Sequence, residues 1–310
     1  MFSTHLEPFT ARDGETLAMY EWPLDHWHSE MGQAALPPRG VVLIVHGLGE
    51  HAARYEHVAH QLLEWGFAVR AYDQRGHGES GGARGVLPTD AALLDDLAEV
   101  IDDTQVRCLR LPHVVRAWAR AGSAPARPLP FILLGHSLGG LVTGRLVSLK
   151  LRAIDGLVMC SPALQVGMGL LQKLALAVGP KVAPNFCVNN GLDVRFISHD
   201  ERVVKRYQAD PLVHRRISPR LARFIADAGP ATVAAASRWS TPTLLMYAGA
   251  DRLVNPEGSR AFARHADESP GVIPGTVTAR CFPDHYHELF NETLSTPVFS
   301  TLKSWLDARF

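Results

Sequence analysis

The chain has 310 residues, 46% of them hydrophobic and 20% charged, which suits one large α/β domain or a core with an inserted part and excludes a disordered chain. Lysine plus arginine and aspartate plus glutamate number 31 each, so the net charge gives no reason to expect a nucleic-acid partner. The four cysteines lie far apart without a zinc-binding pattern, and we expect reduced thiols in a cytoplasmic protein.

The N-terminal part contains a predicted hairpin followed by a buried strand. Residues 16–20 follow an Arg-Asp-Gly turn at 12–14 and are predicted to close the hairpin. Residues 41–45 form an apolar, β-branched run without alternation, which is typical of a strand buried on both faces. Further strands are predicted at 68–72, 131–134, 157–160, 243–247 and 280–282. Helical stretches between most of them predict a mostly parallel sheet covered by helices on both faces.

The alternation of strands and helices stops between residues 160 and 243. Six prolines are predicted to break this part into short helical pieces: Pro162, Pro180, Pro184, Pro211, Pro219 and Pro230. We therefore expect a helical cap at 162–240, inserted between two parts of the core at 1–161 and 241–310.

The predicted cap is both apolar and basic. Its first part, 164–178, is apolar but broken by Gln, Gly and Lys, so we do not expect it to span a bilayer. This part is suited to roof an acyl pocket or to contact a membrane surface transiently, and ordinary packing on the core is the alternative. Arginine and lysine exceed the acids between 202 and 223. We interpret these cations, like the basic segment 107–127, as solvated surface.

An apolar run ends abruptly at Gly135-His136-Ser137-Leu138-Gly139. Leucine and valine then recur at helical spacing up to Leu149. A strand that turns this sharply into a helix strains the residue at its tip and exposes that residue's side chain. The motif therefore predicts a nucleophile elbow with Ser137 as the nucleophile.

A serine nucleophile needs a base, and a third group must orient that base. In an elbow fold the acid and then the histidine follow later strands. Asp251 follows the strand at 243–247 and is the predicted acid. Asp193 and Asp210 fall in the predicted cap, and Asp155 precedes its strand. His285 and His287 both follow the last strand, and spacing alone does not decide between them.

The developing oxyanion needs backbone N–H donors. Leu138, directly after the nucleophile, is one predicted donor. Leu48, in the His-Gly-Leu-Gly-Glu loop after the first buried strand, is the other, because Gly47 lets this backbone approach the serine.

The remaining histidines are interpreted as structural. We expect His46, His77 and His136 to bind loop backbone. His51, His57 and His60 are predicted to share one helix, but acids at ligand spacing are lacking, so no metal site is expected. The proposed chemistry also requires no cofactor.

The order of these motifs resembles the monoacylglycerol lipase and lysophospholipase branch of the α/β-hydrolases over nearly the whole chain. The matching segments are His46 to His51 with Arg54-Tyr55, Tyr72 to Ser80, Gly135 to Gly140, Ser161 to Leu164, Gly249 to Val254 and Tyr286 to Glu292. The resemblance is weakest across the cap and between residues 107 and 130.

The resemblance implies an α/β-hydrolase fold with an inserted helical cap. It places the base in the Tyr-His pair and therefore assigns His287, with Ser137 and Asp251 as its partners and Leu48 and Leu138 as oxyanion donors. The chain departs from the family at Asp284-His285 and in the long segment 107–127.

We therefore expect a serine carboxylic-ester hydrolase that acts on a lipid-like ester, foremost a monoacylglycerol. A lysophospholipase, a short-chain esterase and an acyltransferase are alternatives within the same fold. A catalytically silent scaffold that binds a hydrophobic ligand, or a peripheral membrane module led by the cap, are hypotheses of a different class.

Overall fold

The computed structural model describes residues 4–22, 38–110, 129–167 and 178–310. Its centre is an eight-stranded sheet with the strand order β1-β4-β6-β5-β7-β8-β11-β12. The bounds are β1 Thr4–His5, β4 Met19–Trp22, β5 Val41–Val45, β6 Ala68–Tyr72, β7 Phe131–His136, β8 Gly156–Cys160, β11 Thr243–Ala248 and β12 Val277–Phe282. The six strands from β6 to β12 run parallel, whereas β4 pairs antiparallel with both of its neighbours, β6 and β1. The predicted mostly parallel sheet is confirmed.

The predicted N-terminal hairpin is also present. Strand β2 (Phe9–Thr10) pairs antiparallel with β3 (Thr16–Leu17). Gly14 in the connecting turn has a φ of 88°, a left-handed conformation that glycine adopts without steric cost.

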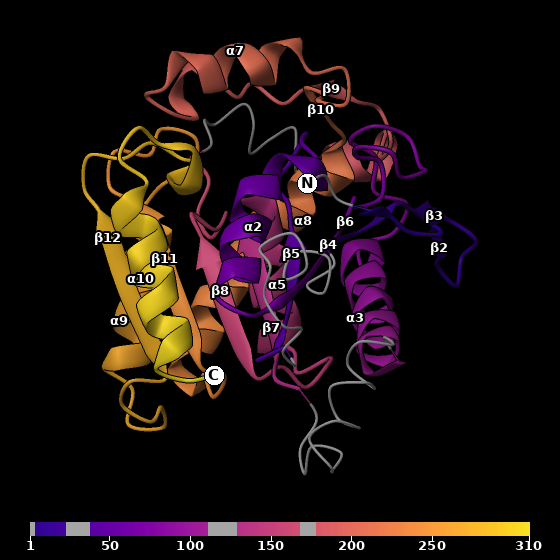
Figure 1. The fold of residues 1–310 in the computed structure, drawn as a ribbon. Helices are drawn as coiled ribbons and strands as arrows, with labels where there is room; N and C mark the ends of the chain where they lie inside the picture. The colour runs from indigo at the N-terminus through magenta and orange to yellow at the C-terminus, as the bar shows by residue number, and fades with distance from the viewer. Residues whose placement is uncertain (1–3, 23–37, 111–128, 168–177) are drawn as a thin grey trace.

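Helices cover both faces of the sheet (Figure 1). One face carries α3 (Ala92–Arg110), α5 (Leu138–Ser148), α8 (Pro219–Ala235) and α9 (Glu257–Asp267), and the other carries α2 (Glu56–Glu64) and α10 (Thr296–Asp307). Strand β5 shows why this sheet needs two layers. Leu43 packs in the first core cluster and Ile44 in the second. Since both of its faces are apolar, β5 appears in the sequence as an unbroken hydrophobic run.

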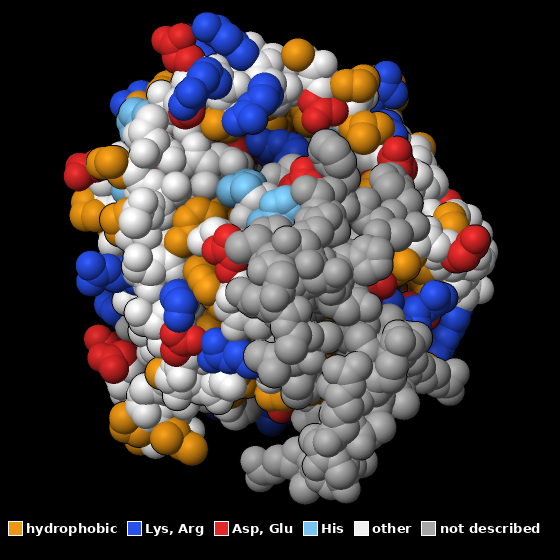
Figure 2. Space-filling view, in the orientation of Figure 1, with side chains coloured by type: hydrophobic (Ala, Val, Ile, Leu, Met, Phe, Trp, Pro, Cys, Tyr) orange, Lys and Arg blue, Asp and Glu red, His pale blue; other side chains and the backbone are white. Residues whose placement is uncertain are grey.

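The part between β8 and β11 lies partly across one end of the sheet. It contains the two-stranded pair of β9 (Val188–Asn189) and β10 (Arg216–Ile217), the short helix η2 (Val194–Phe196) and helix α7 (Glu201–Ala209). Figure 1 shows α7, β9 and β10 at the top of the molecule, and Figure 2 shows Lys and Arg side chains gathered at this end. Residues 168–177 of the predicted apolar segment and 111–127 of the basic segment lie outside the described residues.

Helix α8 belongs to the layer that covers the sheet. Its residues Leu221, Phe224, Ile225 and Ala228 are buried in the same core cluster as α5. Pro230, one of the prolines predicted to break the chain, lies inside this 17-residue helix, so that expectation is wrong for it, whereas Pro219 stands where the helix begins. Pro219 occupies the first turn, where its missing N–H costs nothing, while tertiary packing sustains the helix through Pro230.

The predicted cap boundaries at 162 and 240 stay a prediction, and the packing of α8 favours a shorter insertion. The remaining short helices are η1 (Ala52–Tyr55), η3 (Ala236–Arg238) and η4 (Leu289–Asn291). In the described part of the chain, no helix combines the length and the apolar composition that crossing a membrane requires.

Candidate active site

Ser137 occupies a strained turn between β7 and α5. Its φ of 53° and ψ of −115° lie in a region that side chains rarely adopt. The flanking glycines are required by packing. A Cβ on Gly135 would lie 2.5 Å from the carbonyl oxygen of Gly139, and a Cβ on Gly139 would lie 2.1 Å from that of Val45. The turn therefore has the geometry of a nucleophile elbow.

Backbone hydrogen bonds hold the elbow against the end of β8. The N–H of Ser137 donates to the carbonyl oxygen of Cys160 at 3.0 Å, and its own carbonyl accepts from Ala163 at 3.0 Å. Leu138 is the first residue of α5, so its N–H has no acceptor within the helix. That N–H lies at the positive end of the helix.

Asp251 and His287 follow the neighbouring parallel strands β11 and β12, in which Ala248 is paired with Phe282. The Nδ1 atom of His287 donates to Oδ2 of Asp251 at 2.7 Å, and both side chains are buried. The other carboxylate oxygen accepts from the N–H groups of Leu253 and Val254 at 2.9 and 3.0 Å. The carboxylate is thereby fixed, and Nε2 of the imidazole is left for a second partner.

The electrostatics of this pair favour an imidazolium. Burial alone would lower the pKa of His287, but attraction to the Asp251 carboxylate and their hydrogen bond raise it above its usual range. Burial likewise opposes the charged form of Asp251, yet His287 holds the pKa of that carboxyl below its ordinary value. The pair can therefore accept a proton on the histidine and stabilise the resulting charge.

The elbow and the histidine lie together. The ring of His136, directly before Ser137, has its centroid 4.7 Å from that of His287. His285 is turned elsewhere, because its Nε2 donates to the carbonyl oxygen of Leu294 at 3.0 Å. Among the described residues, the structure thus pairs Asp251 with His287.

The competing acids have other partners. Asp193 binds Arg195, and Asp155 accepts from the backbone N–H of Phe131. Asp210 accepts from Nε2 of His51 at 2.8 Å. His51 precedes η1 and only His57 and His60 lie on α2, so the prediction of one shared helix is wrong for His51. Within the described ranges, no three His, Cys, Asp or Glu side chains are grouped as metal ligands.

The loop after β5 approaches the elbow closely. A Cβ on Gly47 would lie 3.1 Å from Cβ of Ser137, so only glycine allows this contact without displacement. Leu48 follows, and its half-buried side chain lines a cavity of about 500 Å³. This arrangement brings Gly47, the residue directly before the second predicted oxyanion donor, against the nucleophile.

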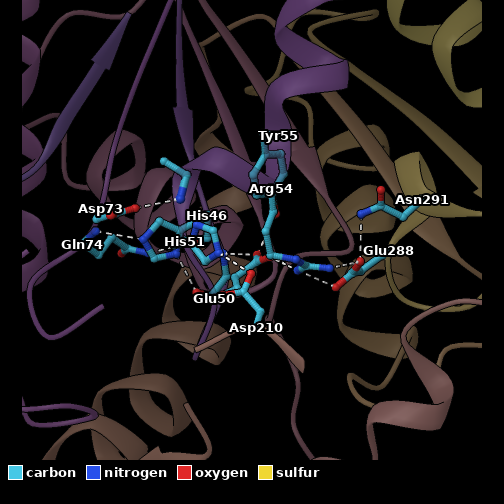
Figure 3. Close-up of polar contacts among 12 residues, drawn as sticks. His46, Glu50, His51, Arg54, Tyr55, Asp73, Gln74, Asp210, Glu288 and Asn291 are labelled. Atoms are coloured by element: carbon cyan, nitrogen blue, oxygen red, sulfur yellow. Dashed lines mark hydrogen bonds and ion pairs between the residues drawn. The ribbon is translucent and has the colours of Figure 1, made fainter. Parts of the chain in front are cut away.

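His46 and His77 bind loop backbone, as expected. Nε2 of His46 accepts from the N–H of Gln74 at 2.8 Å, while its Nδ1 donates to the carbonyl oxygen of Gly47 at 2.8 Å (Figure 3). Burial lowers the pKa of His46, which keeps this ring neutral. His77 donates from Nδ1 to the carbonyl oxygen of Arg75 at 3.0 Å. His46 therefore supports the shape of the loop that carries Leu48.

Three charged side chains that the predictions did not include, Glu50, Arg54 and Glu288, form a cluster with low solvent exposure. Figure 3 shows Arg54 between the two glutamates, and both glutamates act electrostatically on His287. Their signal was present, because all three lie in the matching segments quoted above. Spacing could not reveal the contact, since Arg54 and Glu288 are 234 positions apart in the chain.

Comparison with known proteins agrees with this geometry. The family model described as "Serine aminopeptidase, S33" matches residues 36–294. A monoacylglycerol lipase of Mycolicibacterium smegmatis is 34% identical, over 87% of this chain and 88% of the relative. Phospholipase YtpA of Bacillus subtilis is 28% identical, over 87% of this chain and 96% of the relative.

A solved structure extends the similarity to the whole fold. The crystal structure of Paleococcus ferrophilus monoacylglycerol lipase matches with a TM-score of 0.74 and 28% identity, over 98% of this chain and all of that one. The chain is thus a serine hydrolase with the α/β-hydrolase fold, and it belongs to the family described as Serine aminopeptidase, S33.

Proposed function

We propose that the protein hydrolyses carboxylic esters of lipids, foremost monoacylglycerols, with Ser137, His287 and Asp251 as the catalytic triad. The observation that carries this proposal is the buried Asp251–His287 pair beside a strained serine elbow. The relatives named monoacylglycerol lipase support the substrate class. A catalytically silent scaffold would have no need for this arrangement.

The reaction proceeds by acyl transfer in two steps. Nε2 of His287 takes the hydroxyl proton as Oγ of Ser137 bonds to the ester carbonyl carbon, and Asp251 stabilises the imidazolium. The N–H groups of Leu48 and Leu138 donate to the resulting oxyanion. The C–O bond to the alcohol then breaks, and His287 gives its proton to the leaving oxygen. Water, deprotonated by His287, attacks the acyl carbon; the bond from that carbon to Oγ of Ser137 then breaks, His287 returns the proton to Oγ, and the fatty acid leaves.

The cavity beside Leu48 is the proposed acyl site. Its volume of about 500 Å³ is within the usual range for a small-molecule pocket. The apolar side chains that line it include Leu48, Val166, Phe196, Ile217, Ile225 and Leu253. They come from the loop after β5, the cap region, α8 and the acid loop, so an acyl chain bound there would extend away from the ester carbon.

The first test measures fatty-acid release from a long-chain 1-monoacylglycerol, a long-chain lysophospholipid and a short-chain soluble ester, each with Ser137→Ala as control. We expect the highest kcat/KM for the monoacylglycerol and no turnover by the variant. Preference for the lysophospholipid or the short ester would replace the substrate assignment while retaining the mechanism. Hydrolysis by Ser137→Ala would refute the catalytic assignment.

We also propose transient contact with a membrane surface through the cap region. Val182 and Phe186 are 76% and 68% exposed, which is unusual for large apolar side chains. Exposed cations lie in the same part of the chain: Lys181, Arg202, Lys205, Arg206, Arg215 and Arg216. Apolar and basic groups together suit the surface of an anionic bilayer.

Sedimentation with anionic vesicles tests this contact. We expect binding by wild type and by Ser137→Ala alike, and a loss of binding in Phe186→Asp. Equal binding by Phe186→Asp and wild type would contradict a contact through this segment. The cytoplasmic location also remains a prediction, which the free thiols of Cys160, Cys187 and Cys281 support.

A further inference from the structure

Arg54 lies between two glutamates beside the proposed active site (Figure 3). Its Nη1 and Nη2 atoms donate to the two carboxylate oxygens of Glu288 at 2.9 and 2.8 Å, which is a bidentate pair. Nη1 also donates to Oε2 of Glu50. The exposed fractions of the three side chains are 12% for Arg54, 4% for Glu50 and 6% for Glu288.

Glu50 fixes the loop that carries the proposed oxyanion donor. Its Oε1 accepts from the backbone N–H of Gly47 at 2.6 Å and from the hydroxyl of Tyr55 at 2.7 Å. Gly47 immediately precedes Leu48. The carboxylate of Glu50 therefore holds the peptide next to the one whose N–H is proposed to bind the oxyanion.

Glu288 fixes the loop that carries the proposed base. It immediately follows His287, and its backbone N–H donates to the carbonyl oxygen of Ile197 at 2.8 Å. Its side chain also accepts from Nδ2 of Asn291 at 2.8 Å. Arg54 is bound to both carboxylates, so it joins the loop of Leu48 to the loop of His287.

Stability alone gives a poor account of this cluster. Two carboxylates and one guanidinium leave a net charge of −1, and removing such groups from water costs about as much as their attraction returns. Apolar side chains of similar volume would fill the same space without that cost. The directional contacts are what an apolar replacement could not supply.

We propose that Glu50, Arg54 and Glu288 form a positioning clamp that fixes the Leu48 peptide relative to the imidazole of His287. The proposal rests on the proposed function, because it assigns the clamp to the transition state of that reaction. An oxyanion donor and a proton acceptor act on the same reacting group, so their separation must be held closely. The three residues act through Leu48 and His287 and need not touch the substrate.

The clamp also adds negative charge near the base. The groups that surround His287 are Asp251, Glu288, Glu50, His136 and, bound to both glutamates, Arg54. Burial is the largest influence on the pKa of His287 and lowers it, while Asp251 raises it. Glu288 and Glu50 raise this pKa further. Removing either carboxylate should therefore lower this pKa and extend activity to lower pH.

The test compares Glu50→Gln, Glu288→Gln and Arg54→Lys. Each glutamine variant leaves one carboxylate for Arg54, so a neutral pair stays buried. Asp96→Asn is the matched control, because Arg75 also lies between two carboxylates, Asp13 and Asp96. Asp96 binds Arg75 at 2.6 and 2.7 Å, and their exposed fractions are 2% and 5%.

For each variant, kcat, KM and the pH profile are measured on a soluble ester, together with unfolding in urea. We expect both glutamine variants to lower kcat about tenfold or more with KM changed less than about twofold. The acid limb of Glu288→Gln should move to lower pH by about half a unit or more. Asp96→Asn should lose stability without change in kcat or in the acid limb.

Arg54→Lys separates geometry from charge. Lysine retains the positive charge but loses the planar fork that binds both oxygens of Glu288. For Arg54→Lys we expect a lower kcat and an acid limb of the pH profile at the wild-type position. If Glu288→Gln does not fold, the two single variants Arg54→Lys and Glu50→Gln still test the proposal.

Two results would overturn the clamp. The first is that both glutamine variants keep the wild-type kcat and the wild-type acid limb, and the second is that Asp96→Asn lowers kcat and shifts the acid limb as they do. Ser137→Ala distinguishes this failure from failure of the proposed function. An inactive Ser137→Ala beside unaffected clamp variants would refute only the clamp, whereas an active Ser137→Ala would refute the catalytic assignment on which it rests.

Discussion

Replacing Asp251 by asparagine tests the proposed triad with the least change in shape. The amide oxygen can occupy the position of Oδ1 and accept the same two backbone N–H groups, from Leu253 and Val254. The amide nitrogen then stands where Oδ2 now accepts from His287. His287 must then accept at Nδ1 and carry its proton on Nε2, so it cannot take the proton of Ser137.

A wrong tautomer of this kind lowers kcat by about four orders of magnitude, or about 5 kcal/mol in the activation free energy. The assay is kcat on a soluble ester with active-site titration, and urea unfolding checks that the fold survives. Asp155→Asn is the control, because Asp155 accepts from the N–H of Phe131 at the start of β7, the opposite end of that strand from Ser137. We expect it to retain wild-type kcat. A loss smaller than tenfold in Asp251→Asn would refute the assigned role of the carboxylate.

Three further predictions follow from the same geometry. His287→Ala should abolish turnover of the soluble ester while His285→Ala retains most of it, and the reverse order would move the base. Because the pKa of His287 is raised and only the neutral ring accepts a proton, kcat/KM should rise with pH around a midpoint above 6.5, the ordinary pKa of histidine. A midpoint below 6.5 would contradict the raised pKa. Gly139→Ala should lose more than about 3 kcal/mol in urea unfolding, because its Cβ would lie 2.1 Å from a backbone oxygen, whereas Gly271→Ala, with its nearest atom 3.7 Å away, should be nearly neutral.

The buried strands were predictable because their signal is local. Residues 41–45 and 68–72 are strands with the predicted bounds, and both lie between two helical layers. The first run is apolar throughout, and the second is apolar except for Arg70, which is buried in an ion pair with Glu21. Strand β12 begins at Val277, three residues before its predicted start, and much of its first half is exposed. Polar edge residues such as Thr278 carry no hydrophobic pattern, so this boundary could not be read from the sequence.

The charged clamp marks a second limit of sequence analysis. Glu50, Arg54 and Glu288 appear in the sequence as ordinary surface charges, because their burial depends on two loops that meet only in the folded chain. Helix α8 shows the same limit for packing. The prolines predicted that this part of the chain is a broken cap. In the structure, α8 is a continuous helix whose apolar face packs in the same core cluster as α5.

The choice between His285 and His287 shows why spacing alone was insufficient at the site itself. Ala248 of β11 and Phe282 of β12 are paired in register, and Asp251 comes three residues after the first as His285 comes three after the second. If both chains continued extended beyond the strands, this equal spacing would have placed His285, not His287, beside Asp251. Instead, the N–H of His285 donates to the carbonyl oxygen of Phe282 at 3.3 Å, so the chain turns back directly after the strand. That turn directs His285 to Leu294 and brings His287 to Asp251, and its geometry is a property of the folded loop rather than of the residue count.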